Sequence, residues 1–218
     1  AKMGGVPLEE FLTWKDSTDT ALTERYDDLR GKAKPCNFGL LYGMSAEGFQ
    51  AYAWAAYGLR LSLDEATMMR NAFFELYTGL PDYHEHQRGL VRSHGFVRSP
   101  LGRVRHLPMI EAFDRSVRSK AERQAINSPI QSCLSDMMIW AIARIEEEYG
   151  DDIAVVGTIH DAMIAYVDAD KLQLRAQQAR EIMMSLPFEK VGWNPQLSFP
   201  ADAEGSLLDL AHMEKLKF

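Results

Sequence analysis

Hydrophobic and polar positions are weakly patterned over the first thirty residues and more strongly helical in the stretch that follows. The pattern predicts short helices at residues 9–14 and 21–29, followed by longer ones. Ser45 is placed to cap one of the longer helices, and Ser62 with Glu65 can form the capping box of the next. The longer helices are expected over residues 28–42, 46–58, 63–77 and 82–93.

Strand-forming residues appear after this helical part. Residues 95–107 surround a Pro-Leu-Gly sequence, which predicts a hairpin. Helical spacing returns over residues 115–149. Within that stretch Pro129 predicts a kink or a break, and Ser128 before it is a candidate N-cap.

The last third of the chain predicts strands and a helix. Apolar strands at residues 153–159 and 162–167 are joined by His160 and Asp161, an amphipathic helix follows over residues 169–186, and a last strand is expected near 197–203. This order of elements along the chain, with helices in the first half and then strands with helices, predicts an α+β fold. We divide the chain into a helical part, residues 1–95, and a second part, residues 96–218, that carries the His-Asp hairpin.

Composition narrows the class of protein. With 218 residues, of which 46% are hydrophobic and 25% charged, the chain is expected to be globular rather than disordered. It contains no apolar run long enough for a membrane span and no secretory leader, so we expect no membrane partner and a cytoplasmic location. Cys36 and Cys133 form no CxxC pair, which suits two buried thiols in a reducing compartment.

Charge is distributed unevenly. The net charge of −7 argues against a phosphate-rich partner. Residues 88–123, however, hold nine Lys or Arg against three acids, a local charge of +6 that leaves −13 for the remainder. A basic belt on an acidic body is one way to build a DNA-facing surface, although a solvated face would look the same in the sequence.

Four residues in the first predicted long helix repeat at intervals of four and so lie along one stripe of the helix. They are Arg30, Lys34, Phe38 and Tyr42. Two cations followed by two aromatic rings suit a nucleoside triphosphate, with the cations on phosphates and the rings against sugar and base. The alternative is a surface helix with extended basic side chains and an aromatic anchor. Pro35 predicts a kink in this helix.

The residue types in and around this stripe form a recognisable motif, in addition to their spacing. Arg-x3-Lys-x2-Asn-Phe-Gly-x2-Tyr-Gly, from Arg30 to Gly43, resembles motif B of the family A DNA polymerases, the DNA polymerase I type. The resemblance implies a helical fingers subdomain followed by part of an antiparallel palm sheet packed on helices. It also implies that Arg30 and Lys34 hold the triphosphate of a deoxynucleotide, that Phe38 packs on its sugar, and that Tyr42 stacks at the terminal base pair, with Lys34 counted among the catalytic residues.

His160 and Asp161 follow an apolar strand and precede another, so the predicted hairpin presents them at its tip. A lone His-Asp pair is usually a turn with local hydrogen bonds. Here it resembles motif C of the same family, which is usually His-Asp-Glu. The resemblance implies that Asp161 is catalytic and binds Mg²⁺ and that His160 supports the primer end. Ala162 stands where the family usually has Glu, which removes one carboxylate.

A second stripe lies between these motifs, where Arg123, Asn127 and Gln131 also repeat every four residues. Neutral amides can read minor-groove edges, which are nearly alike for every base pair. The segment resembles the family helix that contacts the primer-template duplex, and Arg103 and Arg105 resemble its preceding hairpin. Gln131 could instead complete a capping box with Ser128.

The family's motif A, which supplies a second metal-binding Asp, has no counterpart before Arg30. We therefore expect the chain to be an excised fragment or one half of a split polymerase, inactive alone, whose partners are primer-template DNA, deoxynucleoside triphosphates and an upstream half that carries motif A. Two alternatives remain open. One is a fragment of a single-subunit phage-type RNA polymerase, and the other is an inert polymerase-derived module for DNA binding or assembly.

Overall fold

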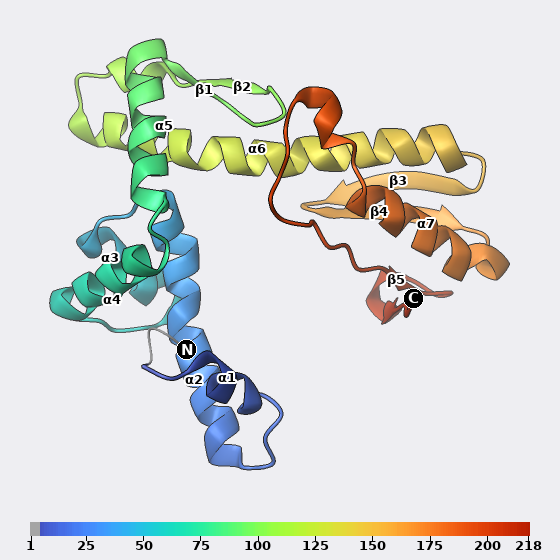
Figure 1. The fold of residues 1–218 in the computed structure, drawn as a ribbon, viewed down its shortest axis with the longest axis horizontal. Helices are drawn as coiled ribbons and strands as arrows, with labels where there is room; N and C mark the ends of the chain where they lie inside the picture. The colour runs from blue at the N-terminus through green and yellow to red at the C-terminus, as the bar shows by residue number, and fades with distance from the viewer. Residues whose placement is uncertain (1–4) are drawn as a thin grey trace. The chain divides into compact units, whose positions relative to one another are not determined.

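The computed structural model describes residues 5–218, which fold into two compact units (Figure 1). One unit holds the chain up to Val97 together with His106–Asn127, and the other holds Arg98–Arg105 and Ser128–Phe218. Long helices and small antiparallel strand pairs make the fold α+β, as the sequence predicted.

The first unit is helical. Its helices are α1 (Leu8–Thr13), α2 (Thr20–Gly39), α3 (Ala46–Tyr57), α4 (Leu63–Leu76) and α5 (Leu80–His94). Local capping sets their starts, because the first turn of a helix has amide donors without partners. Ser45 accepts from the amide of Gly48 at the start of α3, and the predicted capping box of Ser62 with Glu65 is present on α4.

Helix α2 corrects one expectation. The sequence predicted two helices, residues 21–29 and 28–42, but α2 is continuous from Thr20 to Gly39, and only its last turn, Leu40–Tyr42, tightens to a 3₁₀ helix. Pro35 lies inside α2 and does not end it, although it supplies no amide donor. Its ring is buried, so packing offsets the missing hydrogen bond.

The core of this unit contains two apolar clusters. One is centred on α2, α3 and α4 and contains Cys36, Leu40, Phe49, Ala66 and Phe73. The other joins α5 to the segment before and into α6, through Val91, Val97, Leu107, Ile110, Ala121 and Ala125. Burying such side chains stabilises the folded chain by about 25 cal/mol per Å² of apolar surface removed from water.

The predicted hairpin between α5 and α6 is present. Strand β1 (Phe96–Arg98) pairs with β2 (Val104–His106), and the amide of Ser99 donates to the carbonyl of Arg103 at 2.9 Å across the loop. A 3₁₀ turn (Pro108–Glu111) leads from this hairpin toward α6.

Helix α6 (Arg115–Tyr149) corrects a second expectation. It is one helix of 35 residues that passes through Pro129 without a break, so Ser128 caps no helix start. Instead the Ser132 hydroxyl donates to the Ser128 carbonyl at 2.6 Å, and Pro129 is buried. The capping box considered for Ser128 and Gln131 is therefore excluded, because there is no helix end for it to cap.

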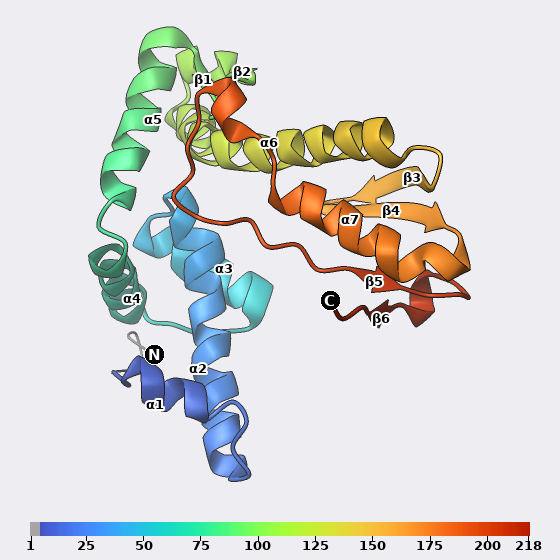
Figure 2. The same cartoon turned by 45° about the vertical axis from the view of Figure 1, so that its right-hand side comes forward.

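The second unit contains the strand pair β3 (Ile153–Ile159) and β4 (Ala162–Val167), as predicted, and helix α7 (Leu172–Met184). Both views show α7 running alongside the two strands (Figure 2). One face of the pair packs on α6 and α7 around Ile145, Ile153 and Ile182. A bulge shifts the register between Val155 and Gly157, which strengthens the local twist.

The C-terminal segment corrects a third expectation. No strand forms over residues 197–203; the short pair there is β5 (Glu204–Gly205) with β6 (Glu214–Lys215). Pro200 interrupts a possible ladder because it has no amide donor. The backbone is held by side chains instead: Arg180 Nε donates to the Ala201 carbonyl at 2.6 Å, and the Phe199 ring lies near Phe188.

Candidate functional site

The stripe on α2 is exposed where a substrate could reach it. Arg30, Lys34 and Phe38 lie on the helix itself, and Tyr42 lies in the 3₁₀ turn that follows. Lys34 is exposed, and Arg30 donates from Nη1 to the Tyr26 hydroxyl at 3.3 Å. Of the two rings in the stripe, Phe38 is 58% exposed, whereas Tyr42 is half-buried. A large exposed ring between two cations and a second ring suits a binding surface better than a packing role.

The opposite side of α2 explains why this stripe stays exposed. Cys36 and Leu40 are fully buried and hold α2 against α3 and α4. Gly39 lies so close to its neighbours that a Cβ there would be 3.1 Å from Tyr52 Cδ1 and 3.3 Å from Phe49 Cδ2. A side chain at residue 39 would require these rings to shift by a few tenths of an ångström, so glycine allows the close approach of α2 to α3.

The turn that carries Tyr42 is held from α5. The amide of Gly43 donates to the Leu40 carbonyl at 3.0 Å, and Gly43 has φ +78°, which glycine adopts without strain. His84, on α5, places its Nε2 2.8 Å from the Leu41 carbonyl. Burial lowers the pKa of His84, with the charges of Arg88 and Arg70 acting in the same direction and the hydrogen bond to Leu41 opposing them.

Sequence reasoning missed this role. It assigned no role to His84, whose side chain is only 3% exposed. A signal was available, because His84, Gln87 and Val91 are three and four residues apart, and all three are buried on one face of α5. What the spacing could not supply is the partner of His84, which lies 43 residues away in the sequence.

The His-Asp turn is the tightest hairpin in the second unit. Ile159 pairs with Ala162, so His160 and Asp161 form the whole two-residue loop between β3 and β4. His160 has φ +55°, and no other non-glycine residue among 5–218 has a positive φ. That conformation costs about 1 kcal/mol for a residue with a side chain. Both side chains are exposed at the tip.

This turn offers one carboxylate to a metal. Within the described part of the chain, no three His, Cys, Asp or Glu side chains come together in a way that could hold a metal ion. Ala162, the first residue of β4, adds no ligand. Mg²⁺ is commonly held by one or two carboxylates together with waters and substrate phosphates, so Asp161 is suited to be one ligand of such a site, and residues 5–218 bring no second carboxylate to it.

The predicted duplex-contacting residues of α6 differ in their surroundings. Arg123 is exposed and donates from Nη1 to the Ser119 hydroxyl at 2.8 Å, and Gln131 is exposed. Asn127 is partly buried, and its Oδ1 is buried without a hydrogen-bond partner among residues 5–218. An amide oxygen without a partner is costly, so this atom has capacity for a hydrogen bond.

The basic belt is partly neutralised within the protein. Arg92 Nε donates to Glu122 at 2.8 Å, and Arg118 donates to the carbonyls of Ala112 and Phe113. Arg103 forms an ion pair with Asp136, while Arg105 is exposed on β2. The charge count of the sequence therefore overstates the positive charge that is free to meet phosphates.

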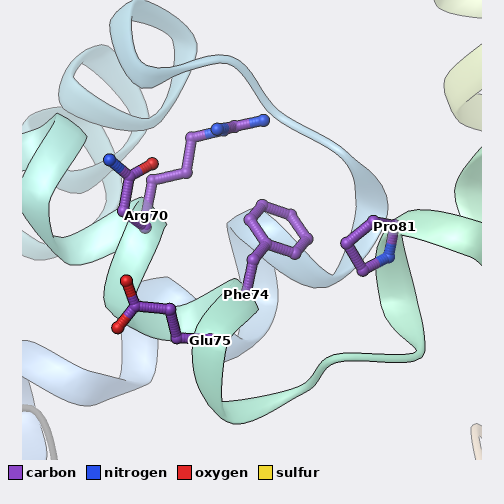
Figure 3. A pocket seen from close by; sticks show the side chains of 5 residues that line it. Arg70, Phe74, Glu75 and Pro81 are labelled. Atoms are coloured by element: carbon purple, nitrogen blue, oxygen red, sulfur yellow. The ribbon is translucent and has the colours of Figure 1, made fainter.

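A hollow of about 410 Å³ lies between α4 and the start of α5, outside every residue predicted for the site (Figure 3). Arg70, Asn71, Phe74, Glu75 and Pro81 line it. The guanidinium of Arg70 lies over the Phe74 ring, 4.9 Å from its centre.

Between residues 5 and 218, none of the helices combines the length and apolar character needed to cross a lipid bilayer.

Comparison with known proteins places these features in a family. The family model of DNA polymerase family A matches residues 12–204. DNA polymerase I of Pseudomonas aeruginosa is 32% identical over 186 residues, which cover 84% of this chain and 18% of that protein. DNA polymerase theta of Drosophila melanogaster is 32% identical over 168 residues, which cover 72% of this chain and 8% of that protein. The chain therefore spans less than a fifth of the length of these relatives.

A solved structure is similar as well. The POL domain of Pol1 from M. smegmatis, in complex with DNA primer-template and dNTP, superimposes with a TM-score of 0.64 at 26% identity. The match covers 84% of this chain and 29% of that one.

Proposed function

Because this chain belongs to DNA polymerase family A, we propose that it is the part of a DNA-templated DNA polymerase that binds the incoming nucleotide and contributes one metal ligand. The observation that carries the proposal is the exposed stripe on α2, with the Phe38 ring in solvent between Lys34 and Tyr42. The substrates are a primer-template duplex and deoxynucleoside triphosphates.

In this proposal the α2 stripe binds the nucleotide. Arg30 and Lys34 bind its triphosphate, because a guanidinium and an ammonium form charge-assisted hydrogen bonds to phosphate oxygens. Lys34 also stabilises charge that develops as the bond to the leaving pyrophosphate breaks. Phe38 packs on the sugar, and Tyr42 stacks on the terminal base pair.

The hairpin tip binds the metal and the primer end. Asp161 would be a ligand of Mg²⁺, which when bound steadies the attacking 3′-oxygen and the departing phosphates. The strained turn holds Asp161 and His160 at the exposed end of two paired strands, which fixes their backbone. His160 supports the primer terminus by hydrogen bonding.

Duplex DNA is contacted by α6 and by the β1–β2 hairpin. Asn127 and Gln131 supply amide groups to the minor groove. An amide can donate and accept there, and the minor-groove edges are nearly alike for every base pair, so the contact does not depend on sequence. Arg123, Arg103 and Arg105 contact phosphates, which gives affinity without sequence preference.

An upstream polypeptide completes the site. A second carboxylate has to come from outside the described residues, since these bring no further ligand to Asp161. Among residues 5–218, β3 and β4 pair only with each other, so each strand leaves one edge open, and Tyr166 and Val156 are 74% and 54% exposed. We propose that a strand of the upstream polypeptide pairs with one of these edges and carries the missing Asp, so that the isolated chain does not catalyse nucleotidyl transfer.

The test is primer extension with Mg²⁺ and all four deoxynucleotides, with the chain alone and with the upstream polymerase portion added. We expect extension only in the mixture, and its loss with Asp161→Ala. The matched control is Asp151→Ala, which removes an exposed carboxylate from the turn before β3. Extension by the mixture that survives Asp161→Ala would refute the assigned metal ligand.

A second candidate is an inert module that binds DNA or assembles with a partner. Ala162 favours it, because the position offers no carboxylate. Under this alternative, primer-template binding persists and no extension appears even when the upstream portion is present.

A further inference from the structure

We propose that Tyr83 and His84, consecutive residues on α5, are positioning residues that fix the turn bearing Tyr42. They thereby set where the terminal base pair of the primer-template duplex stacks. The inference rests on the proposed function for the role of Tyr42. Its structural part, a clamp on the turn, stands on contacts within the first unit alone.

The first contact of the clamp is made by His84. The Leu41 carbonyl comes where α2 gives way to a 3₁₀ turn, and carbonyls at such ends lack partners in the helix. A carbonyl only accepts, so the Nε2 of His84, at 2.8 Å, carries the proton and donates. The His84 ring is further held edge-on against Phe74, with ring centres 5.8 Å apart.

The second contact is made by Tyr83. Its hydroxyl donates to the Ile126 carbonyl of α6 at 2.8 Å. Burial raises the pKa of Tyr83 to about 12, and the nearby Tyr42 adds to the shift, so the two tyrosines are neighbours. α5 is thus bonded on one side to the turn after α2 and on the other to α6.

Steric contact closes the clamp on the far side of Tyr42. A Cβ on Gly43 would be 3.1 Å from both Arg88 Nη2 of α5 and Ile126 Cδ1 of α6. The residues before and after Tyr42, Leu41 and Gly43, are therefore both held by α5, one by a hydrogen bond and one by close packing. Tyr42 has little freedom to move unless α5 releases the turn.

The test uses His84→Leu, which keeps an apolar side chain but removes the donor, and His84→Gln, whose amide nitrogen can replace Nε2. His86→Leu, on the exposed face of the same helix, is the matched control. We expect backbone amide exchange at residues 41–44 to be about tenfold faster in His84→Leu, and near the parent rate in His84→Gln and His86→Leu. Unchanged exchange in folded His84→Leu would overturn the clamp.

Tyr83→Phe deletes a single hydroxyl and gives the same readout if His84→Leu does not fold. The consequence for catalysis is measured in the complete polymerase that carries this chain, as KM for dATP against kcat. We expect His84→Leu to raise KM several-fold and His84→Gln to restore it. Faster exchange with an unchanged KM would keep the clamp but overturn its role in nucleotide positioning, and no extension by the parent would count against the proposed function instead.

Discussion

The Nε of Arg103, in the loop of the β1–β2 hairpin, donates to Asp136 of α6 at 2.8 Å, and its Nη2 contacts the same carboxylate oxygen. The pair raises the pKa of Arg103, through the hydrogen bond first and the charge of Asp136 second. The other oxygen of Asp136 is buried without a hydrogen-bond partner within residues 5–218. Arg103 therefore helps to hold the hairpin loop on α6, in addition to the phosphate contact that we propose for it.

A double-mutant cycle tests this pair. Arg103→Ala and Asp136→Ala are each expected to lower the urea midpoint of unfolding, and the double variant to lower it by less than the sum. Arg105→Ala, which removes an exposed arginine from the adjacent strand, serves as control and is expected to leave the midpoint unchanged. Strictly additive effects would show that the two residues do not interact in solution.

Two phenylalanines of the first unit are expected to separate stability from binding. Phe49 is fully buried between α2 and α4, so Phe49→Ala is expected to lower the free energy of unfolding by about 3–5 kcal/mol. Phe38→Ala removes an exposed ring and is expected to leave that free energy nearly unchanged while weakening deoxynucleotide binding. Denaturant unfolding gives the first quantity and titration with dATP the second. If Phe38→Ala were strongly destabilised, Phe38 would contribute to the stability of the fold and not only to nucleotide binding.

Two lysines of α2 provide a similar comparison. Lys34 lies on the proposed nucleotide stripe, whereas Lys32 forms an ion pair with Asp28 at 2.7 Å. Lys34→Ala is expected to weaken dATP binding by about tenfold or more, because a charge-assisted contact to phosphate is lost. Lys32→Ala removes the same charge from the same helix and is expected to have little effect. Equal losses would indicate a general effect of charge, not a specific contact.

The buried His84 predicts a pH dependence of stability. Burial lowers its pKa in the folded chain below the usual 6.5, so the unfolded chain takes up a proton first as the pH falls. Stability is therefore expected to decrease as the pH drops below about 6.5, until the folded-state pKa is reached. The comparison is the unfolding free energy of the parent minus that of His84→Gln across this range. A difference that does not vary with pH would contradict the burial effect.

The two cysteines are expected to resist thiol reagents in the folded chain. Burial raises the pKa of Cys36 to about 11, and burial with the charge of Asp136 raises that of Cys133. The reactive thiolate is therefore scarce as well as shielded. Labelling with an aromatic disulfide at mildly alkaline pH is expected to be slow in native buffer and to reach both thiols in denaturant. Rapid native labelling would show that one of these sites opens readily.

Much of the local structure follows from the sequence alone. The capping box of Ser62 and Glu65 and the left-handed stop at Gly43 depend on contacts within a few residues. The same holds for the two-residue turn at His160 and Asp161, because these two polar residues separate two apolar runs of strand length. Spacing also placed Arg30, Lys34 and Phe38 on one face of a helix.

Tertiary packing decided the remainder, because it depends on partners far away in the sequence. Proline predicts a break only when nothing offsets the missing donor, and the buried surroundings of Pro129 let α6 continue. The apolar residues at 197–203 predicted a strand, but they pair with no strand among residues 5–218, and Arg180 donates to the Ala201 carbonyl instead. Which side of α2 faces the core, and the bond of His84 to Leu41, were settled by contacts between helices, since a spacing rule gives a face but not what lies against it.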